Sequence, residues 1–301
     1  MQNSLLSKYS GAVPRYTSYP TAPHFHEGVD NGVYQQWLQA ITGEERVSLY
    51  LHIPFCDRLC WFCACHTKHT LKYEPITTYL ESLKKEISTV GSLVSRNAVV
   101  SAVHFGGGSP TMLRPEDLIG LMAALRQAFH FSDDVEISVE MDPNDLDEPR
   151  YDALADIGMT RASLGVQDFH PDVQRAINRI QTFEHTKSVV DAVRARGVHS
   201  VNCDILYGLP HQTEETLAET VRDILSLSPD RIALFGYAHV PWMKKHQTMI
   251  KDEWLPDGTQ RLQQSMAARA MILAGGYDEV GLDHFALPSD SLALASHTSN
   301  L

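Results

Sequence analysis

Short apolar runs rich in β-branched residues alternate along the chain with longer segments whose apolar residues recur every three or four positions. The longer segments have the spacing of amphipathic helices. Two of them begin at Pro75 and Pro115, because proline suits the first helical turn, and a third spans residues 183–196 and ends at Gly197. The short runs predict seven strands, at residues 47–53, 99–105, 135–141, 161–166, 201–207, 231–238 and 279–282.

Strands that alternate with helices predict an α/β fold with a parallel sheet and right-handed crossovers. Six or seven such units over residues 47–285 suit a TIM-like (β/α) barrel, complete or partial, and an open doubly wound sheet is the alternative. In both folds ligands bind where the strands end. Residues of unusual chemistry lie in or just after these strands: Cys56, residues 106–108, Glu140, Gln167, Asp168 and Asp204.

A further helix is expected to begin near Thr213. Glu214 and Glu215 follow it and favour a helix N-terminus. A strict capping box is not expected, because Thr216 stands where that motif has an acid or an amide.

Composition narrows the class of protein. The chain has 301 residues and a net charge of −12, with 43% hydrophobic and 21% charged residues, which is typical of a soluble globular protein and excludes a disordered or fibrous one. No apolar run is long enough to span a membrane, and no secretory signal is visible, so we expect a cytoplasmic protein. The acidic balance argues against binding of nucleic acid.

The cysteines carry the strongest chemical signal. Four of the five lie between Cys56 and Cys65 in the pattern C-x3-C-x2-C-x-C, too close together for a disulfide framework. Clustered thiols suit an iron–sulfur cluster, zinc or copper(I). His66 and His69 could complete a zinc site, so zinc remains an alternative. We favour a cluster with one open iron, and the remaining cysteine, Cys203, is expected to be a small buried hydrophobe.

Several phrases around this loop resemble one family. The C-x3-C-x2-C loop, and the glycines after the second strand, are similar to those of the radical S-adenosylmethionine (SAM) superfamily. The segments PRYTSYPTA (14–22) and LYLHIPFC (49–56), together with Cys65, GVQDF (165–169) and DILYGLP (204–210), resemble the oxygen-independent coproporphyrinogen III oxidase family. The resemblance runs from about Ser10 to about Pro288.

This resemblance implies cofactors and the residues that bind them. Cys56, Cys60 and Cys63 would hold a [4Fe–4S] cluster, and Cys65 would match an additional cysteine that does not ligate the cluster and is a candidate catalytic residue. Two SAM molecules are implied. The residues matching their sites are Tyr50, Phe62, Gly107, Gly108, Ser109, Glu140, Gln167, Arg179, Asp204 and Ala238. Without the resemblance, Arg179 reads as a solvated loop residue and His104 as a core or rim histidine.

The implied activity belongs to anaerobic haem biosynthesis. Electron transfer to SAM would generate a 5′-deoxyadenosyl radical, and two rounds would decarboxylate two propionates of coproporphyrinogen III to vinyls, giving protoporphyrinogen IX. A flavodoxin or ferredoxin would donate electrons to a monomer. The alternatives are a related radical SAM haem chaperone or haem-processing enzyme and, outside enzymes, a zinc-stabilised binding module.

The resemblance also suggests how the chain is divided. We expect residues 1–46 to form an extension packing near the active site, 47–290 the barrel, and 291–301 the start of a truncated region. Family members continue into a helical C-terminal domain that this chain, ending at Leu301, is expected to lack. We therefore expect the chain to hold a cluster but to decarboxylate the substrate more slowly than a longer form.

Overall fold

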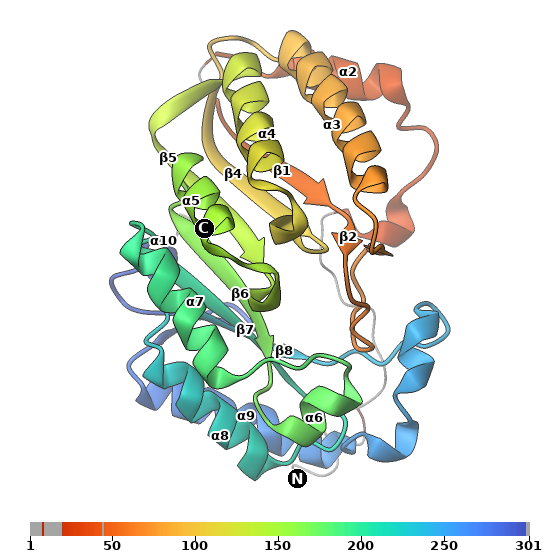
Figure 1. The fold of residues 1–301 in the computed structure, drawn as a ribbon, viewed down its shortest axis with the longest axis vertical. Helices are drawn as coiled ribbons and strands as arrows, with labels where there is room; N and C mark the ends of the chain where they lie inside the picture. Colours follow the sequence, from red (N-terminus) through yellow and green to blue (C-terminus); the bar gives the residue numbers. More distant parts are fainter. Residues whose placement is uncertain (1–7, 9–19, 44, 299–301) are drawn as a thin grey trace.

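A mostly parallel sheet forms the centre of the molecule (Figure 1). The computed structural model describes residues 8, 20–43 and 45–298. Within these residues the main sheet has the order β1-β4-β5-β6-β7-β8-β10-β9. The pairs from β1-β4 to β7-β8 are parallel, and β10 is antiparallel to both β8 and β9. The strands are β1 (Arg46–Ile53), β4 (Val99–Gly107), β5 (His130–Met141), β6 (Arg161–Gln167), β7 (Ser200–Tyr207), β8 (Arg231–Gly236), β9 (Asp278–Val280) and β10 (His284–Ala286).

This sheet confirms the predicted α/β fold and partial barrel, and it corrects the last strand. In the described residues β1 and β9 are the two edges of the sheet, so the barrel is partial rather than complete. The strand predicted at residues 279–282 exists as β9 but is not another parallel unit. Gly281 adopts a φ of +70°, which lets the chain reverse and form β10 as an antiparallel neighbour.

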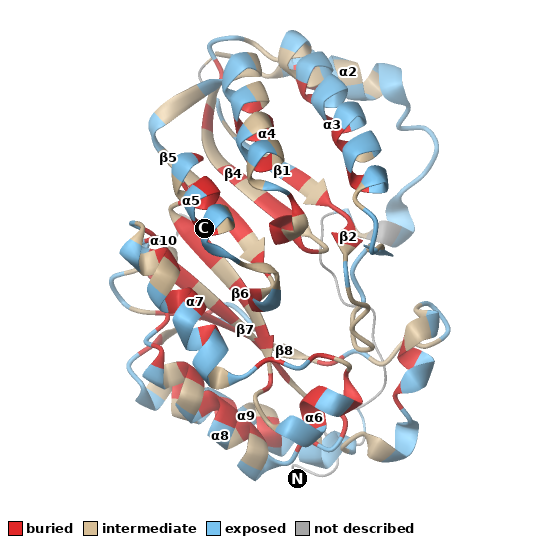
Figure 2. Ribbon diagram, viewed as in Figure 1, coloured by how far each residue is buried: buried red, intermediate tan, exposed pale blue. Residues whose placement is uncertain are grey.

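Helices pack along the outer face of the sheet, and their inward sides are the buried ones (Figure 2). The predicted helices are all present, and α2, α5 and α9 were not singled out from the sequence. The main helices are α2 (Asn31–Ala40), α3 (Glu74–Leu93), α4 (Pro115–Ala128), α5 (Glu148–Asp156), α7 (Phe183–Ala195), α8 (Glu214–Ser226) and α9 (Gly258–Ala274). A shorter helix, α10 (Ser291–His297), follows the last strand. None of the helices in the described residues is long and apolar enough to cross a membrane.

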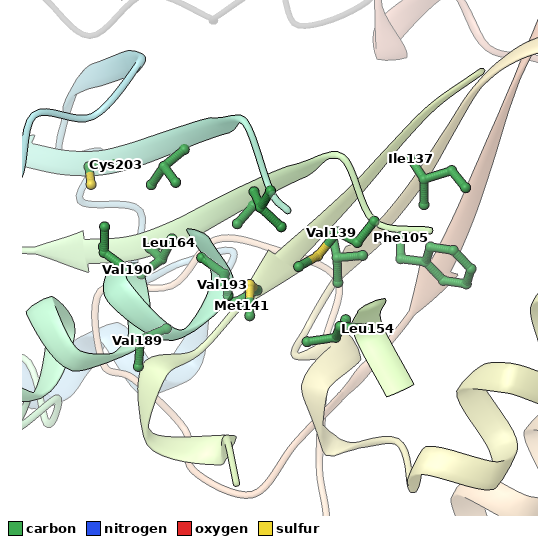
Figure 3. Close-up of a cluster of buried hydrophobic side chains, with 14 of the residues drawn as sticks. Phe105, Ile137, Val139, Met141, Leu154, Leu164, Val189, Val190, Val193 and Cys203 are labelled. Carbon is green, nitrogen blue, oxygen red and sulfur yellow. The ribbon is translucent and has the colours of Figure 1, made fainter. Parts of the chain in front are cut away.

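Alternation along each strand separates the core from the site. On β7, the side chains of Val201, Cys203 and Ile205 are fully buried, whereas Asn202 and Asp204 face the other side of the sheet. Figure 3 shows the apolar side, where Cys203 and Leu164 lie among the valines of α7. The prediction that Cys203 is a buried hydrophobe is thus confirmed. The opposite, inner face is polar, and it carries His104, Glu136, Ser138, Glu140, Ser163, Gln167, Asn202 and Asp204.

The N-terminus of α8 is capped more fully than expected. The Thr213 hydroxyl accepts a hydrogen bond from the Thr216 N–H at 3.2 Å, and the Thr216 hydroxyl accepts one from the Thr213 N–H at 3.0 Å. The expectation that no capping box forms was therefore wrong, because the threonine hydroxyl takes the place of the usual acid or amide.

Removing this cap has a measurable consequence. We expect Thr213→Ala to lower the free energy of unfolding by about 1 kcal/mol, because the Thr216 N–H loses its acceptor in the first turn. Urea unfolding followed by circular dichroism measures the change. A variant as stable as the parent chain would show that the cap contributes nothing.

The segment 14–22, which carried much of the resemblance, lies mostly outside the described residues. The expected packing of residues 1–46 near the site therefore has only its later part on view, which includes α2 beside α3. Trp37 and Tyr34 on α2 remain exposed.

Candidate active site

The cysteine loop leaves the sheet directly after β1. Its two ends are joined by a short parallel pair, β2 (Phe55–Cys56) with β3 (Lys68–His69), and the Lys68 N–H donates to the Pro54 carbonyl at 2.6 Å. The His69 ring bonds the Asp57 carbonyl at 2.8 Å. The loop is therefore closed at its base by backbone pairing and held over the edge of the sheet where the parallel strands end.

One cavity collects the cysteines of this loop. Cys56, Cys60, Cys63 and Cys65 all line a cavity of about 230 Å³ that opens against the inner face of the sheet. Eight of the ten predicted cofactor residues line the same cavity: Phe62, Gly107, Gly108, Ser109, Glu140, Gln167, Arg179 and Asp204. Residues separated by almost 150 positions in the sequence thus converge on one site, as the carboxyl ends of parallel strands require.

Without a metal, burial makes two thiols of this loop harder to ionise. Burial, reinforced by the sulfurs of Cys63 and Cys60, raises the pKa of Cys56 to about 12. Burial also raises the pKa of Cys60, although the Arg179 guanidinium opposes it. A hydrogen bond from Cys65 lowers the pKa of Cys63. Cys56 and Cys60 therefore need a cationic centre to ionise readily, which is what an iron–sulfur cluster supplies.

The cysteines that line the cavity suit a cluster better than a single metal ion. Among the described residues, no three His, Cys, Asp or Glu side chains converge closely enough to hold one metal ion. A single zinc needs all of its ligands at one point, whereas the cysteines of a [4Fe–4S] cluster each bind a different iron. The His69 ring is bonded to the Asp57 carbonyl, and the three cysteines that line the cavity fit the cluster.

The glycines after β4 allow close packing. A Cβ on Gly108 would lie 2.6 Å from the Phe55 carbonyl oxygen, and one on Gly107 would lie 2.7 Å from the His52 ring. The N–H groups of Gly108 and Ser109 donate to the carbonyls of Ile53 and Phe55, each at 2.8 Å. Both N–H groups are therefore used within the chain, where they pair the end of β4 with the start of the cysteine loop.

Glu140 is held as a carboxylate on the inner wall. The His104 ring bonds its Oε1 at 3.1 Å, and the Gly107 N–H donates to Oε2 at 2.9 Å. Burial raises the pKa of Glu140, but these two hydrogen bonds outweigh it and the net pKa is lowered. Glu140 therefore faces the cavity charged, ready for an ammonium or hydroxyl donor.

His104 connects Glu140 to Tyr50. The two rings stack with 5.6 Å between their centroids, and the Tyr50 hydroxyl bonds His52 at 3.0 Å. Tyr50 thus lies one side chain away from the cavity wall rather than lining the cavity itself. His104, which the sequence alone placed in the core or at a rim, orients a predicted cofactor residue.

Arg179 is buried, not solvated as its loop position suggests. It donates to Asp142 Oδ2 at 2.9 Å and to the Gly165 carbonyl at 2.6 Å, and it lies 3.6 Å from Cys60 Sγ. Among the described residues its Nε has no hydrogen-bond partner. Arg179 lines the cavity beside Cys60, and the positive charge of its guanidinium suits a carboxylate-bearing cofactor.

Asp204 is the most perturbed acid of the inner wall. It accepts hydrogen bonds from Asn202 at 2.8 Å and Ser163 at 3.5 Å, and burial is the largest cause that raises its pKa from 3.8 to about 6. The folded chain therefore favours the neutral acid. The stability this confers is complete below the unfolded pKa and is lost as the pH rises through 6.

We expect Asp204→Asn to remove the contribution of this residue to the pH dependence of stability. The stability of the variant relative to the parent should rise by about 1 kcal/mol of unfolding free energy from pH 5 to pH 7.5, because the variant carries no charge to desolvate. Urea unfolding at the two pH values measures the gain. An equal difference between variant and parent at both would contradict the assignment.

The structure adds residues that the sequence did not single out. Ser163 and Asp142 line the cavity. The predicted residues Cys65 and Gln167 line it as well, and Gln167 has a φ of +70°. Strand alternation was the available signal for Ser163, since it lies opposite Asp204 on the same face. Ala238 does not line the cavity; its carbonyl accepts from Gln247, which also bonds the Phe62 carbonyl.

Comparison with known proteins agrees with this site. The model of the radical SAM superfamily matches residues 50–224. The chain is 52% identical over 291 residues to an oxygen-independent coproporphyrinogen III oxidase of Paracoccus denitrificans, covering 96% of this chain and 64% of that protein. It is 50% identical over 283 residues to one of Bradyrhizobium diazoefficiens, covering 94% and 63%.

A solved structure gives the same result. The coproporphyrinogen III oxidase (HemN) from Escherichia coli, described as a radical SAM enzyme, superposes with a TM-score of 0.91 at 40% identity, covering 98% of this chain and 66% of that one. The chain therefore spans a little under two thirds of the length of these relatives.

Proposed function

We propose that this chain, which belongs to the radical SAM superfamily and groups by sequence with the oxygen-independent coproporphyrinogen III oxidases, is the barrel of an enzyme that oxidatively decarboxylates coproporphyrinogen III. The observation that carries the proposal is the single cavity lined by Cys56, Cys60 and Cys63 together with eight predicted cofactor residues. The matched relatives are oxidases, which favours this activity over a haem chaperone.

The cofactors of the chain are a [4Fe–4S] cluster and SAM, as in its superfamily. When bound, they supply a carbon-centred radical that can remove a hydrogen atom from a propionate side chain. We assign cluster binding to Cys56, Cys60 and Cys63, which lie on the loop side of the cavity. Cys65 lines the cavity as well and is assigned no bond to the cluster.

The inner wall would bind and orient SAM. Glu140, charged and fixed by His104, suits the SAM ammonium or ribose hydroxyls. Arg179 supplies positive charge to the cavity for a carboxylate, and Asp204 and Gln167 extend the polar wall. We further propose that a second SAM molecule binds, as the resemblance implies; Tyr50 and Ala238, which match the two SAM sites but lie outside this cavity, leave room for it beyond the cavity wall.

The whole enzyme has features beyond this barrel. We propose that residues 1–46 pack near the site, that 47–290 form the barrel and that 291–301 begin a further region. We also propose that the protein is a cytoplasmic monomer that takes electrons from a flavodoxin or ferredoxin, because a cluster of free thiols requires a reducing compartment. The proposed substrate is a tetracarboxylate. Because Arg179 is bonded to Asp142 and to the Gly165 carbonyl, the carboxylates of the substrate need other cations.

An anaerobic assay tests the proposal. The chain is loaded with iron and sulfide, reduced, and given SAM and coproporphyrinogen III, and 5′-deoxyadenosine and CO2 are measured. We expect both products to form only when the cluster and SAM are present. A loaded chain that cleaves no SAM would overturn the proposal, and one that cleaves SAM without releasing CO2 would restrict it to the cofactor chemistry. Haem titration in parallel tests the chaperone alternative.

A further inference from the structure

The outer side of the cysteine loop is held by a segment nearly 180 residues away in the sequence. After β8 the chain forms a short 3₁₀ helix, Lys245–Met249. Three side chains from this region bond three carbonyls of the loop. Lys244 donates to the Cys65 carbonyl at 2.8 Å, His246 bonds the Cys63 carbonyl at 2.7 Å, and Gln247 donates to the Phe62 carbonyl at 2.9 Å.

Gln247 is the buried centre of this contact. Its side chain is 0% exposed, and its Nε2 also donates to the Ala238 carbonyl at 3.2 Å. Its Oε1 accepts from the Val240 N–H at 2.6 Å. All the hydrogen-bonding capacity used by this amide thus connects the cysteine loop to the end of β8, and no other polar group of the side chain is left for solvent.

The contact lies behind residues that face the cavity. Phe62, Cys63 and Cys65 line the cavity with their side chains, while their carbonyls are bonded from outside. On the other side of the loop, Asn178 donates to the Leu59 carbonyl at 2.9 Å and the Trp61 N–H donates to the Ile177 carbonyl at 2.9 Å. The loop is therefore held between the β6–α7 connection and the segment after β8.

We propose that Gln247 is a positioning residue, which fixes the distance between the cysteine loop at Phe62 and the end of β8 at Ala238, with His246 orienting Cys63. Outer contacts of this kind decide how ligands are presented, because a ligand held in one orientation need not be ordered when the metal binds. The proposal rests on the proposed function for its meaning, since Cys63 is a cluster ligand only there. The hydrogen bonds themselves do not depend on it.

The loop cysteines of the metal-free chain provide the first test. We expect Gln247→Met, which keeps the volume and removes every hydrogen bond, to raise the rate of iodoacetamide labelling of Cys60 and Cys63 about tenfold. Mass spectrometry of digested samples measures labelling at each cysteine. The matched control is Gln264→Met. Gln264 lies on α9, is also buried, and bonds both the Gly208 N–H and the Gln212 carbonyl. The control should label at the parent rate.

The loaded chain provides the second test. We expect Gln247→Met to lose its cluster to a chelator about tenfold faster than the parent and to change the EPR spectrum of the reduced cluster on addition of SAM, whereas Gln264→Met does neither. If Gln247→Met does not fold, His246→Ala removes only the Cys63 contact and should raise Cys63 labelling about threefold. Labelling of Gln247→Met, or of His246→Ala, equal to that of Gln264→Met would overturn the inference.

The two tests separate this inference from the proposed function. Labelling needs no cluster and no SAM, so a parent chain that assembles no cluster would overturn the proposed function while the labelling result stands. A parent chain that assembles a cluster and cleaves SAM, with the Gln247 variant labelled like its control, would overturn only the positioning role.

Discussion

Replacing Cys60 with serine should leave the barrel folded and remove its ability to hold a [4Fe–4S] cluster. Cys60 lies in the cavity with Cys56 and Cys63, and serine is a hard oxygen ligand where a soft thiolate is required. We expect the iron and acid-labile sulfide content after anaerobic reconstitution to fall to background, and SAM cleavage to drop more than about 100-fold, beyond the loss caused by changing an outer contact. Iron analysis and 5′-deoxyadenosine measurement report the two effects.

Cys65→Ser is the matched control in the same loop. Cys65 donates a hydrogen bond to Cys63 and is assigned no cluster bond, so its serine variant should keep a cluster content close to that of the parent. Urea unfolding of both metal-free variants checks that the fold is retained. A cluster that survives Cys60→Ser, or one that Cys65→Ser abolishes equally, would show that the ligand set is wrong.

Arg179→Met should destabilise the metal-free chain by about 3 kcal/mol. The guanidinium is 9% exposed and Asp142 is 13% exposed, so methionine leaves a buried carboxylate without its cation and the Gly165 carbonyl without a donor. Urea unfolding at pH 7.5 measures the loss. The same variant, loaded with the cluster, should bind SAM more weakly, because the cavity loses the positive charge of Arg179.

Arg196 provides the control for this substitution. It also bonds two carboxylates, Glu148 at 2.6 Å and Asp152 at 2.9 Å, but these acids are exposed and water screens the pairs. Arg196→Met should therefore change stability much less and leave SAM binding unaltered. Equal losses in the two variants would mean that burial of the Arg179 pair has no energetic consequence.

Much of the architecture follows from local pattern. The β-branched runs predicted the parallel strands to within a few residues, except that β5 begins five residues earlier, at His130, than its apolar run suggests. The first turn of α3 and the whole of α4 follow from proline and from helical spacing. The antiparallel β10 was missed, because only three residues pair and their direction depends on the turn at Gly281.

The candidate site was predictable where a motif names it. The spacing of Cys56, Cys60 and Cys63 indicated a soft-metal site without any structure, and strand ends indicated Glu140 and Asp204. Arg179 was interpreted as a solvated loop residue, because the neighbouring sequence does not indicate that it pairs with Asp142, 37 positions away. The roles of His104 and Gln247 were not predicted from the sequence for the same reason. Their partners come from other strands and loops.

The sequence by itself determined the α/β alternation, the soft thiolate loop and the family to which the chain belongs, because these depend on residue type and spacing along a few consecutive positions. The tertiary structure alone decided which polar groups meet. It shows that the Gly108 N–H donates to the Ile53 carbonyl and the Gly107 N–H to Glu140. It buries Arg179 against Asp142 and ties the cysteine loop to Gln247. Hydrogen bonds and ion pairs act over a few ångströms, so their partners are fixed only once the chain has folded.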